Sequence, residues 1–341
     1  MKITRSRTLT AATIVMAVMA LAACGSSDST ASNGVTSTVA SGASSSTAVS
    51  TTTATPSTVN GVARSAAETK TGIAYATASN SQTLDLYLPK SDGSKPVPVV
   101  VLIHGGAFKM GDSSMEASHA QALLDKGIAA ASVNYRLSGE APFPAGAQDV
   151  KASVRWLRAN AAKYGLDPDR IGAWGESAGG WMANMLGATG DQATVFDDPT
   201  VNQDQSSAVR AVVSWFGPTD FTTMDAQANQ TKCTSPDVHG TAGSPESAWL
   251  GEPVATSTKA QQTNLTAYVD TAKALPAWFL AHGDSDCQVS PGQSAELKAA
   301  LEQKGVTPTY TILPGARHAD PAFDQTQLTP SIDFLVAALS K

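Results

Sequence analysis

The sequence predicts an α/β fold, in which helices cover both faces of a doubly wound, mostly parallel sheet. Three observations support this prediction. Short apolar runs such as Val97 to Ile103 are rich in β-branched residues, which is typical of strands buried on both faces of a parallel sheet. Longer stretches with apolar residues at helical spacing alternate with these runs. The length of 341 residues suffices for one large domain of this class or two small ones.

The first 23 residues are predicted to be a signal peptide and no part of the fold. Basic residues at Lys2, Arg5 and Arg7 precede an apolar stretch, 9–21, that is short for a permanent membrane anchor. The stretch runs into Leu-Ala-Ala-Cys-Gly, which resembles a bacterial lipobox with Cys24 as the lipidated mature N-terminus. An ordinary secretory signal with a chance cysteine is the alternative. The resemblance implies an exported protein, lipid-anchored to the periplasmic or extracellular face of the cell envelope.

Residues 24–65 are predicted to form the lipidated cysteine and a disordered tether. From 25 to about 59 the chain is nearly all Ser, Thr, Ala, Gly and Val, with almost no charge. Such a stretch buries too little apolar surface to offset its conformational entropy. The folded domain is therefore expected to span 66–341.

The elements expected within this domain alternate along the chain. Two strands with alternating apolar and polar residues, 72–76 and 83–88, are predicted to pair antiparallel at an edge of the sheet. The remaining predicted strands are 97–103, 128–135, 170–174, 209–215, 277–281 and 309–313, and the predicted helices are 117–126, 147–164, 180–186, 291–304 and 331–339. Between 218 and 273 the pattern breaks into a polar, loop-rich segment. This segment is predicted to be an insertion over the carboxyl edge of the sheet, where loops carry ligand specificity.

A Gly-Glu-Ser-Ala-Gly turn at 175–179 lies between a predicted strand and a predicted helix. This context is the one that a nucleophile elbow requires, because the tight turn raises the central side chain above the sheet. Ser177 is therefore the predicted nucleophile. The alternative is a glycine-rich strand-to-helix loop without chemistry.

Backbone donors for an oxyanion are predicted from a second glycine-containing loop. His104-Gly105-Gly106-Ala107-Phe108 follows the strand ending at Ile103, and its glycines allow the backbone to approach a substrate oxygen. The N–H groups of Gly105, Gly106 and Ala178 are the predicted donors. His104 is expected to brace this loop.

The acid and the base are predicted from loops that follow the last two strands. Asp286 and Asp284 both lie after the strand ending at Ala281, and Asp286 is preferred because it lies where a carboxylate usually faces the base. Asp284 is expected to hydrogen-bond within its turn. His318 follows the last strand and is the predicted base. The order Ser, Asp, His along the chain is that of an α/β-hydrolase triad.

The other histidines and the remaining cysteines are assigned structural roles. His282 is expected to be structural, and His119 and His239 are expected to be ordinary surface residues. Cys233 and Cys287 remain after lipidation of Cys24, and an even pair in an exported protein indicates a disulfide. This bridge would tie the insertion to the loop of the predicted acid. Two free buried thiols are the alternative.

From about residue 66 onward the sequence resembles the α/β-hydrolase superfamily, and especially its BD-FAE-like carboxylesterases near the hormone-sensitive-lipase esterases. The resemblance implies metal-free and cofactor-free hydrolysis of short acyl or feruloyl-type esters, in small molecules or on polysaccharides. Ala107 is a departure, since many relatives have a third glycine there. The matching segments are 104–108, 134–137, 143–145, 148–150, 175–180, 244–247, 250–251, the loop of Asp286, and Gly315 with His318.

Composition and motifs argue against some classes of function and leave two alternatives to an esterase. The net charge of −6 and the 6% aromatic content argue against a nucleic-acid partner. Three widely spaced cysteines indicate no zinc site. A serine peptidase of the same fold and a non-catalytic binding protein on the same scaffold are the alternatives to an esterase. A binding protein derived from a hydrolase would be expected to lack a triad member, and this sequence supplies all three.

Overall fold

The computed structural model describes residues 61–190, 192–231 and 233–340. The predicted signal peptide, Cys24 and all but the last residues of the predicted tether lie outside the described residues. Within the described ranges, no helix has both the length and the apolar character needed to cross a membrane.

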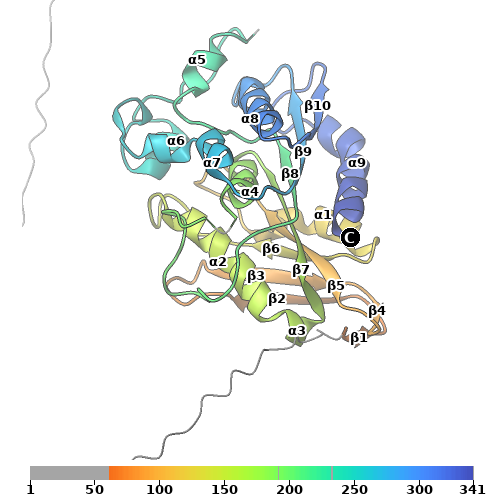
Figure 1. Ribbon diagram of the computed structural model, residues 1–341. Coiled ribbons are helices and arrows are strands. Elements are labelled where there is room, and N and C mark those ends of the chain that lie inside the picture. The colour runs from red at the N-terminus through yellow and green to blue at the C-terminus, as the bar shows by residue number, and fades with distance from the viewer. Residues whose placement is uncertain (1–60, 191, 232, 341) are drawn as a thin grey trace, which may run out of the picture. The chain divides into compact units, whose positions relative to one another are not determined.

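An eight-stranded sheet runs through the described domain in the order β10-β9-β8-β7-β5-β6-β3-β2. The five pairs from β10 to β6 are all parallel, whereas β3 pairs antiparallel with both β6 and β2. The prediction of a mostly parallel sheet with an antiparallel edge is therefore confirmed (Figure 1). Its strands are β2 Glu68–Ala74, β3 Thr83–Leu88, β5 Val97–Ile103, β6 Ala129–Val133, β7 Leu166–Glu176, β8 Ala211–Trp215, β9 Ala277–Gly283 and β10 Thr309–Leu313.

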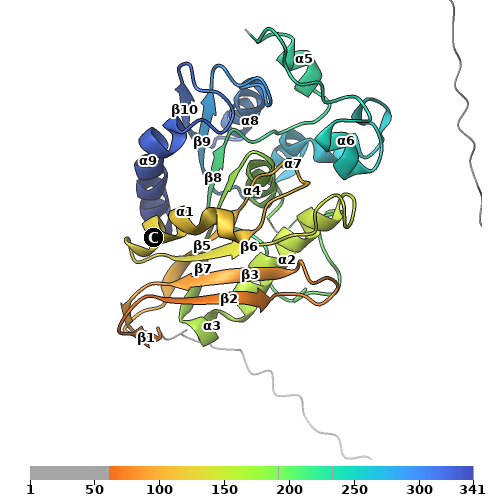
Figure 2. The same ribbon diagram turned by 180° about the vertical axis from the view of Figure 1, so that it is seen from behind.

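Helices cover both faces of this sheet, as the fold class predicts. α1 and α9 pack on one face, while α2, α4 and α8 pack on the other (Figures 1 and 2). The helices are α1 Ala117–Leu124, α2 Ala145–Ala159, α3 Ala161–Tyr164, α4 Ala178–Thr189, α5 Met224–Ala228, α6 Pro245–Leu250, α7 Leu265–Thr271, α8 Gly292–Gln303 and α9 Ala322–Leu339. Each face has its own buried apolar cluster, because side chains alternate between the two faces along each strand.

The parallel strands end at one edge of the sheet, and the predicted functional loops follow those ends. The loop with Gly105 follows β5, Ser177 follows β7, Asp286 follows β9 and His318 follows β10. The predicted insertion contributes the short helices α5, α6 and α7. This topology brings residues that are more than a hundred positions apart in the sequence to a common edge.

Several boundaries differ from those predicted, and two of these differences lie at the ends of the described domain. A two-residue strand, β1 Ala63–Arg64, pairs with β4 Ser91–Asp92, although the tether was expected to continue to residue 65. α9 begins at Ala322, nine residues before its predicted start, and contains Pro330. Proline usually marks a helix boundary, but Phe323 is buried in the core and anchors the extra turns.

Candidate active site

The predicted nucleophile lies in a tight turn between β7 and α4. Ser177 has φ 52° and ψ −120°, a strained conformation for a residue with a side chain. The helix that follows can approach the sheet only through glycine, since a Cβ on Gly179 would lie 2.0 Å from the carbonyl oxygen of Ile103. The backbone N–H of Ser177 donates to the carbonyl oxygen of Trp215 on β8, which holds the turn against the sheet.

The structure brings the three predicted triad residues into one hydrogen-bonded chain. His318 Nε2 lies 2.8 Å from Ser177 Oγ, and His318 Nδ1 lies 2.7 Å from Asp286 Oδ2. The ring of Phe216 packs edge-on against His318 at a centroid distance of 4.8 Å. These contacts arrange a hydroxyl, an imidazole and a carboxylate in the order that nucleophilic catalysis requires.

Asp286 is fully buried and held through both carboxylate oxygens. Oδ1 accepts hydrogen bonds from the backbone N–H groups of Gln288 and Val289, both at 2.9 Å. Burial alone would raise the pKa of Asp286, but hydrogen bonds from His282 and His318 outweigh burial and hold it well below its ordinary value. The carboxylate therefore stays ionised beside the imidazole.

His282 supports the acid, a role that its sequence position did not reveal. Its ring is completely buried, with Nδ1 2.7 Å from Ser294 Oγ and Nε2 2.9 Å from the carbonyl oxygen of Val289. Nε2 also lies 3.3 Å from Asp286 Oδ2. The available signal was the spacing, because His282 comes four residues before Asp286 at the end of β9.

Asp284, the alternative acid, faces another turn. Its Oδ1 accepts from the backbone N–H of Gly315 at 2.7 Å and from Ser285 Oγ at 2.9 Å. Gly315 lies three residues before His318, so this carboxylate braces the loop that carries the imidazole. The geometry therefore favours Asp286 over Asp284 as the direct partner of His318.

The predicted oxyanion donors come from the loop after β5 and from the residue after the nucleophile. Among the described residues, none accepts a hydrogen bond from the backbone N–H of Gly105, Gly106 or Ala178. A Cβ on Gly105 would lie 3.4 Å from Ser177 Cβ, so this loop passes close to the nucleophile. Ala107, the departure from a third glycine, adopts φ 56°, so the loop keeps a left-handed backbone there.

His104 braces the loop of the predicted oxyanion donors, 104–108, as the sequence suggested. Its ring stacks on Tyr135 with centroids 4.5 Å apart, and Tyr135 donates its hydroxyl proton to the His104 carbonyl oxygen. Burial lowers the pKa of His104, which favours a neutral ring.

A cleft of about 460 Å³ opens over Ser177 and His318. Its walls come from the loop of the predicted oxyanion donors, from the loop after β9 and from the insertion. This arrangement confirms the prediction that the insertion lies over the candidate site. The lining residues are Ala107, Phe108, Ser177, Ala178, Pro218, Asp237, Val238, His239, Thr241, Gly243, Ser244, Pro245, Glu246, Gln288, Val289 and His318.

A disulfide joins the insertion to the loop of the acid. Cys233 and Cys287 are bonded, with Cα atoms 5.7 Å apart. The backbone N–H of Asp237 also donates to the carbonyl oxygen of Cys287 at 2.9 Å. Because Cys287 adjoins Asp286, these links connect the cleft wall to the acid.

We expect Cys233→Ser to reduce both stability and turnover. The bridge spans 54 residues, for which the chain-entropy model gives a stabilisation of about 4 kcal/mol. Turnover should fall at temperatures well below the melting transition, because the acid loop loses a covalent restraint and displacement by about 1 Å can cost about 100-fold in rate. Calorimetry measures the loss of stability. Initial rates, measured at a temperature that is 20 °C lower than the melting temperature, test the loss of turnover. An unchanged rate there would show that the bridge acts on stability alone.

His119 and His239 are both buried, so the prediction that they are surface residues is wrong. They are 6% and 4% exposed, and each is paired with acidic side chains. His119 Nδ1 lies 2.9 Å from Glu116 Oε2, and its Nε2 lies 3.1 Å from Asp324 Oδ1. Asp324 lies far from His119 in the sequence, so this contact left no local signal.

In the described part of the chain, three side chains near the nucleophile are of types that can bind a metal ion: Glu116, His119 and Glu176. Their possible ligand atoms lie within 4.8 Å of one another. Both nitrogens of His119 already face carboxylates, so the group is an ion-paired cluster. Burial alone would lower the pKa of His119, but Glu116, Glu176 and Asp324 outweigh it and raise it to about 9. Burial, with the charges of Glu116 and Asp324, raises the pKa of Glu176.

We expect the free energy of unfolding to fall as the pH rises from about 6.5 to about 9. A histidine whose pKa is raised on folding stabilises the fold fully below its unfolded pKa, and this contribution disappears as the pH rises through the folded pKa. The His119 contribution is at most about 3 kcal/mol. Urea unfolding at pH 6.5 and 9.5 measures it, and His119→Gln should show a smaller fall. Equal falls in both proteins would contradict the assignment.

Comparison with known proteins gives a family match over the greater part of the chain. The BD-FAE family profile matches residues 84–301. Esterase LipQ of Mycobacterium tuberculosis is 28% identical over 262 residues, which cover 75% of this chain and 58% of LipQ. Carboxylesterase NlhH of the same species is 45% identical over 92 residues, or 26% of this chain and 28% of NlhH. The chain thus spans little more than half the length of LipQ.

Solved structures show the same architecture. A truncated carbohydrate esterase from gut microbiota superposes with a TM-score of 0.71 at 29% identity, covering 83% of this chain and 100% of that one. A bifunctional GH43-CE protein of Bacteroides eggerthii has a TM-score of 0.68 at 35% identity, covering 80% of this chain and 38% of that one. Thermogutta terrifontis esterase 2 has a TM-score of 0.62 at 22% identity, covering 80% of this chain and 94% of that one, which supports the fold alone.

Proposed function

Since the chain belongs to the BD-FAE family of α/β-hydrolase-fold proteins, we propose that it is a serine carboxylester hydrolase. One observation carries the proposal: a hydrogen-bonded chain runs from Ser177 through His318 to Asp286, and its Ser177 and His318 line a cleft. The backbone N–H groups of the predicted oxyanion donors have no acceptor among the described residues. Nucleophile, base, acid and oxyanion donors are the parts that acyl transfer requires.

The proposed reaction has two steps. Ser177 Oγ attacks the ester carbonyl while His318 Nε2 takes its proton, and Asp286 holds the Nδ1–H tautomer and stabilises the imidazolium. The N–H groups of Gly105, Gly106 and Ala178 stabilise the oxyanion. His318 then gives its proton to the departing alcohol, and water, activated by the same imidazole, cleaves the acyl-enzyme.

We propose short acyl or feruloyl-type esters as substrates, in small molecules or on polysaccharides. The cleft is larger than an acetyl group needs, so it has room for part of the alcohol or for a larger acyl group. The carbohydrate esterase among the similar structures supports the polysaccharide-linked option.

A hydrolysis screen tests the activity. Substrates are p-nitrophenyl esters of rising chain length, methyl ferulate, acetylated xylan and a p-nitroanilide, with EDTA in parallel. We expect ester hydrolysis that EDTA leaves unchanged. Hydrolysis of the anilide without the esters would favour a peptidase, and no hydrolysis of any substrate would favour a binding protein.

We also propose that Cys24 carries a lipid that anchors the protein to the bacterial cell envelope. The support is the resemblance of residues 21–25 to a lipobox after a basic and then an apolar stretch. Cys24→Ser should move the expressed protein out of the membrane fraction, while esterase activity per molecule stays the same, because the lipid is attached outside the folded domain. Persistent membrane association would point to an uncleaved apolar segment as the anchor.

A further inference from the structure

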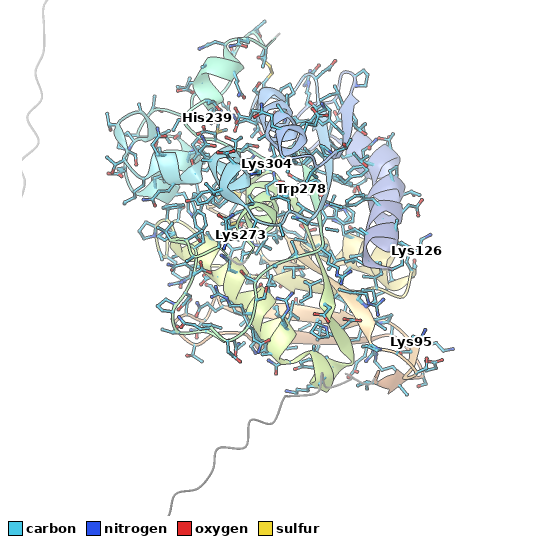
Figure 3. The ribbon with its side chains drawn as sticks, in the orientation of Figure 1. Lys95, Lys126, His239, Lys273, Trp278 and Lys304 are labelled. Carbon is cyan, nitrogen blue, oxygen red and sulfur yellow. A yellow bond between two sulfur atoms is a disulfide. The ribbon has the colours of Figure 1, made fainter. Side chains whose placement is uncertain are left out.

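His239 and Glu246 form a buried polar pair in the wall of the candidate active-site cleft. Both come from the insertion, His239 from the loop between α5 and α6 (Figure 3) and Glu246 from the first turn of α6. Their side chains are 5% and 8% exposed. Polar side chains this deeply buried in a wall normally have complete hydrogen bonding.

This pair is incompletely hydrogen-bonded. His239 Nδ1 lies 3.1 Å from Glu246 Oε2, yet the two are poorly aligned, and neither atom has a hydrogen-bond partner among the described residues. The second ring nitrogen, Nε2, and the second carboxylate oxygen, Oε1, also have no hydrogen-bond partner among the described residues. Unlike Nδ1 and Oε2 they are not fully buried, so they are the atoms that a ligand in the cleft can reach. Leaving such groups unsatisfied costs free energy unless a ligand or water completes them.

The backbone around the pair is fixed independently of it. The N–H groups of His239 and Gly240 donate to the two carboxylate oxygens of Asp225, at 2.6 and 2.9 Å. Ser244 Oγ donates to the carbonyl oxygen of His239 at 2.6 Å, and Ser244 also caps α6. The unsatisfied atoms are therefore held in place before any ligand arrives, which is a property of specificity sites.

The charges of His239 and Glu246 determine which chemical group of a ligand can bind between them. Burial alone would lower the pKa of His239, but Glu246, Asp225 and Asp237 raise it, so the ring offers a donor while the carboxylate offers an acceptor. A hydroxyl both donates and accepts, and so can satisfy both. A second carboxylate would be repelled by Glu246, an ammonium group has no acceptor to offer the His239 donor, and an alkyl group would leave both unsatisfied.

We propose that His239 and Glu246 form a specificity subsite that binds a hydroxyl group of the ester substrate. This inference rests on the proposed esterase function, since the pair shares its cleft with Ser177 and His318. The hydroxyl belongs either to a sugar-type alcohol or to a phenolic acyl group, which present the same chemistry. Thr241 and Gln288 line the same cleft and can complete the hydrogen bonding of such a group.

The test compares matched esters with wild-type protein. One arm uses a monoacetate of methyl xyloside with free hydroxyls against its O-methylated analogue. The other uses methyl ferulate against methyl 3,4-dimethoxycinnamate. In one arm we expect kcat/KM for the free hydroxyl compound to exceed that of its methylated partner by about ten- to a hundredfold, the range for a hydrogen bond to a charged group. The arm that responds identifies which part of the substrate carries the hydroxyl.

Glu246→Gln should shrink this preference by about tenfold, because the charged acceptor becomes a neutral amide of the same shape. Glu252→Gln is the matched control, since it makes the same change in the insertion outside the cleft-lining set, and it should keep the wild-type preference. No preference in either wild-type arm, or one unchanged in Glu246→Gln, would overturn the subsite while leaving the esterase function intact. Hydrolysis of no ester at all would overturn the proposed function and the subsite with it.

Discussion

Ser177→Ala is expected to lower kcat by about a million-fold, the size of the loss when a triad serine is removed from a comparable hydrolase. The side-chain oxygen is the only group in the described cleft that His318 Nε2 contacts as a potential nucleophile, at 2.8 Å. Alanine keeps the Cβ and the backbone bond to Trp215, so the fold should remain.

Initial rates on an ester that the wild type hydrolyses, together with a thermal melt, measure these two expectations. Ser285→Ala is a suitable control, because Ser285 also lies at the carboxyl edge of the sheet but donates to Asp284 and not to His318. That variant should remain active. Substantial activity in Ser177→Ala would reject Ser177 as the nucleophile.

The strand pattern and the nucleophile turn could be predicted because their signals are local. β5 coincides with the predicted 97–103, and β10 with the predicted 309–313, since uninterrupted apolar runs specify buried strands directly. The turn at 175–179 carries its own steric requirement, as the close approach of Gly179 to Ile103 shows. The alternation of strands and helices then predicted that the candidate catalytic residues lie at one edge of the sheet.

Predictions were wrong or incomplete where a feature depends on contacts with residues far away in the sequence. His119 lies between Glu116, Glu176 and Asp324, and the last of these comes from α9 on a remote part of the chain. Nothing in the local pattern around His119 indicates that α9 covers it. The N-terminal turns of α9 itself were missed for a related reason, because burial of Phe323 against the sheet outweighs the local signal of Pro330.

The choice between the two aspartates shows where sequence and structure contribute differently. Spacing within the loop favoured Asp286, but both residues satisfy the order of the triad. The contacts separate them, because Asp286 Oδ2 lies 2.7 Å from His318 Nδ1 whereas Asp284 Oδ1 accepts from Gly315 and Ser285. Their substitution therefore gives the sharpest test of the assigned roles.

Asp286→Asn is expected to lower kcat by up to about 10⁴-fold, the loss found when a triad aspartate becomes asparagine. The N–H groups of Gln288 and Val289 both point at Oδ1, so an asparagine would place its oxygen there and turn its NH₂ group toward His318. That NH₂ would donate to Nδ1 and force the proton onto Nε2. The imidazole would then face Ser177 with a proton and could not accept another as a base.

Asp284→Asn is the matched comparison and should keep activity within about tenfold of the wild type, because an amide oxygen can still accept from Gly315 and Ser285. Rates for both variants on one ester, with melting temperatures to exclude unfolding, decide the matter. The two aspartates lie two residues apart in one loop, so a general disturbance of that loop would affect both variants alike. A greater loss in Asp284→Asn would transfer the role of acid to Asp284, whereas equal small losses would mean that His318 needs no carboxylate partner.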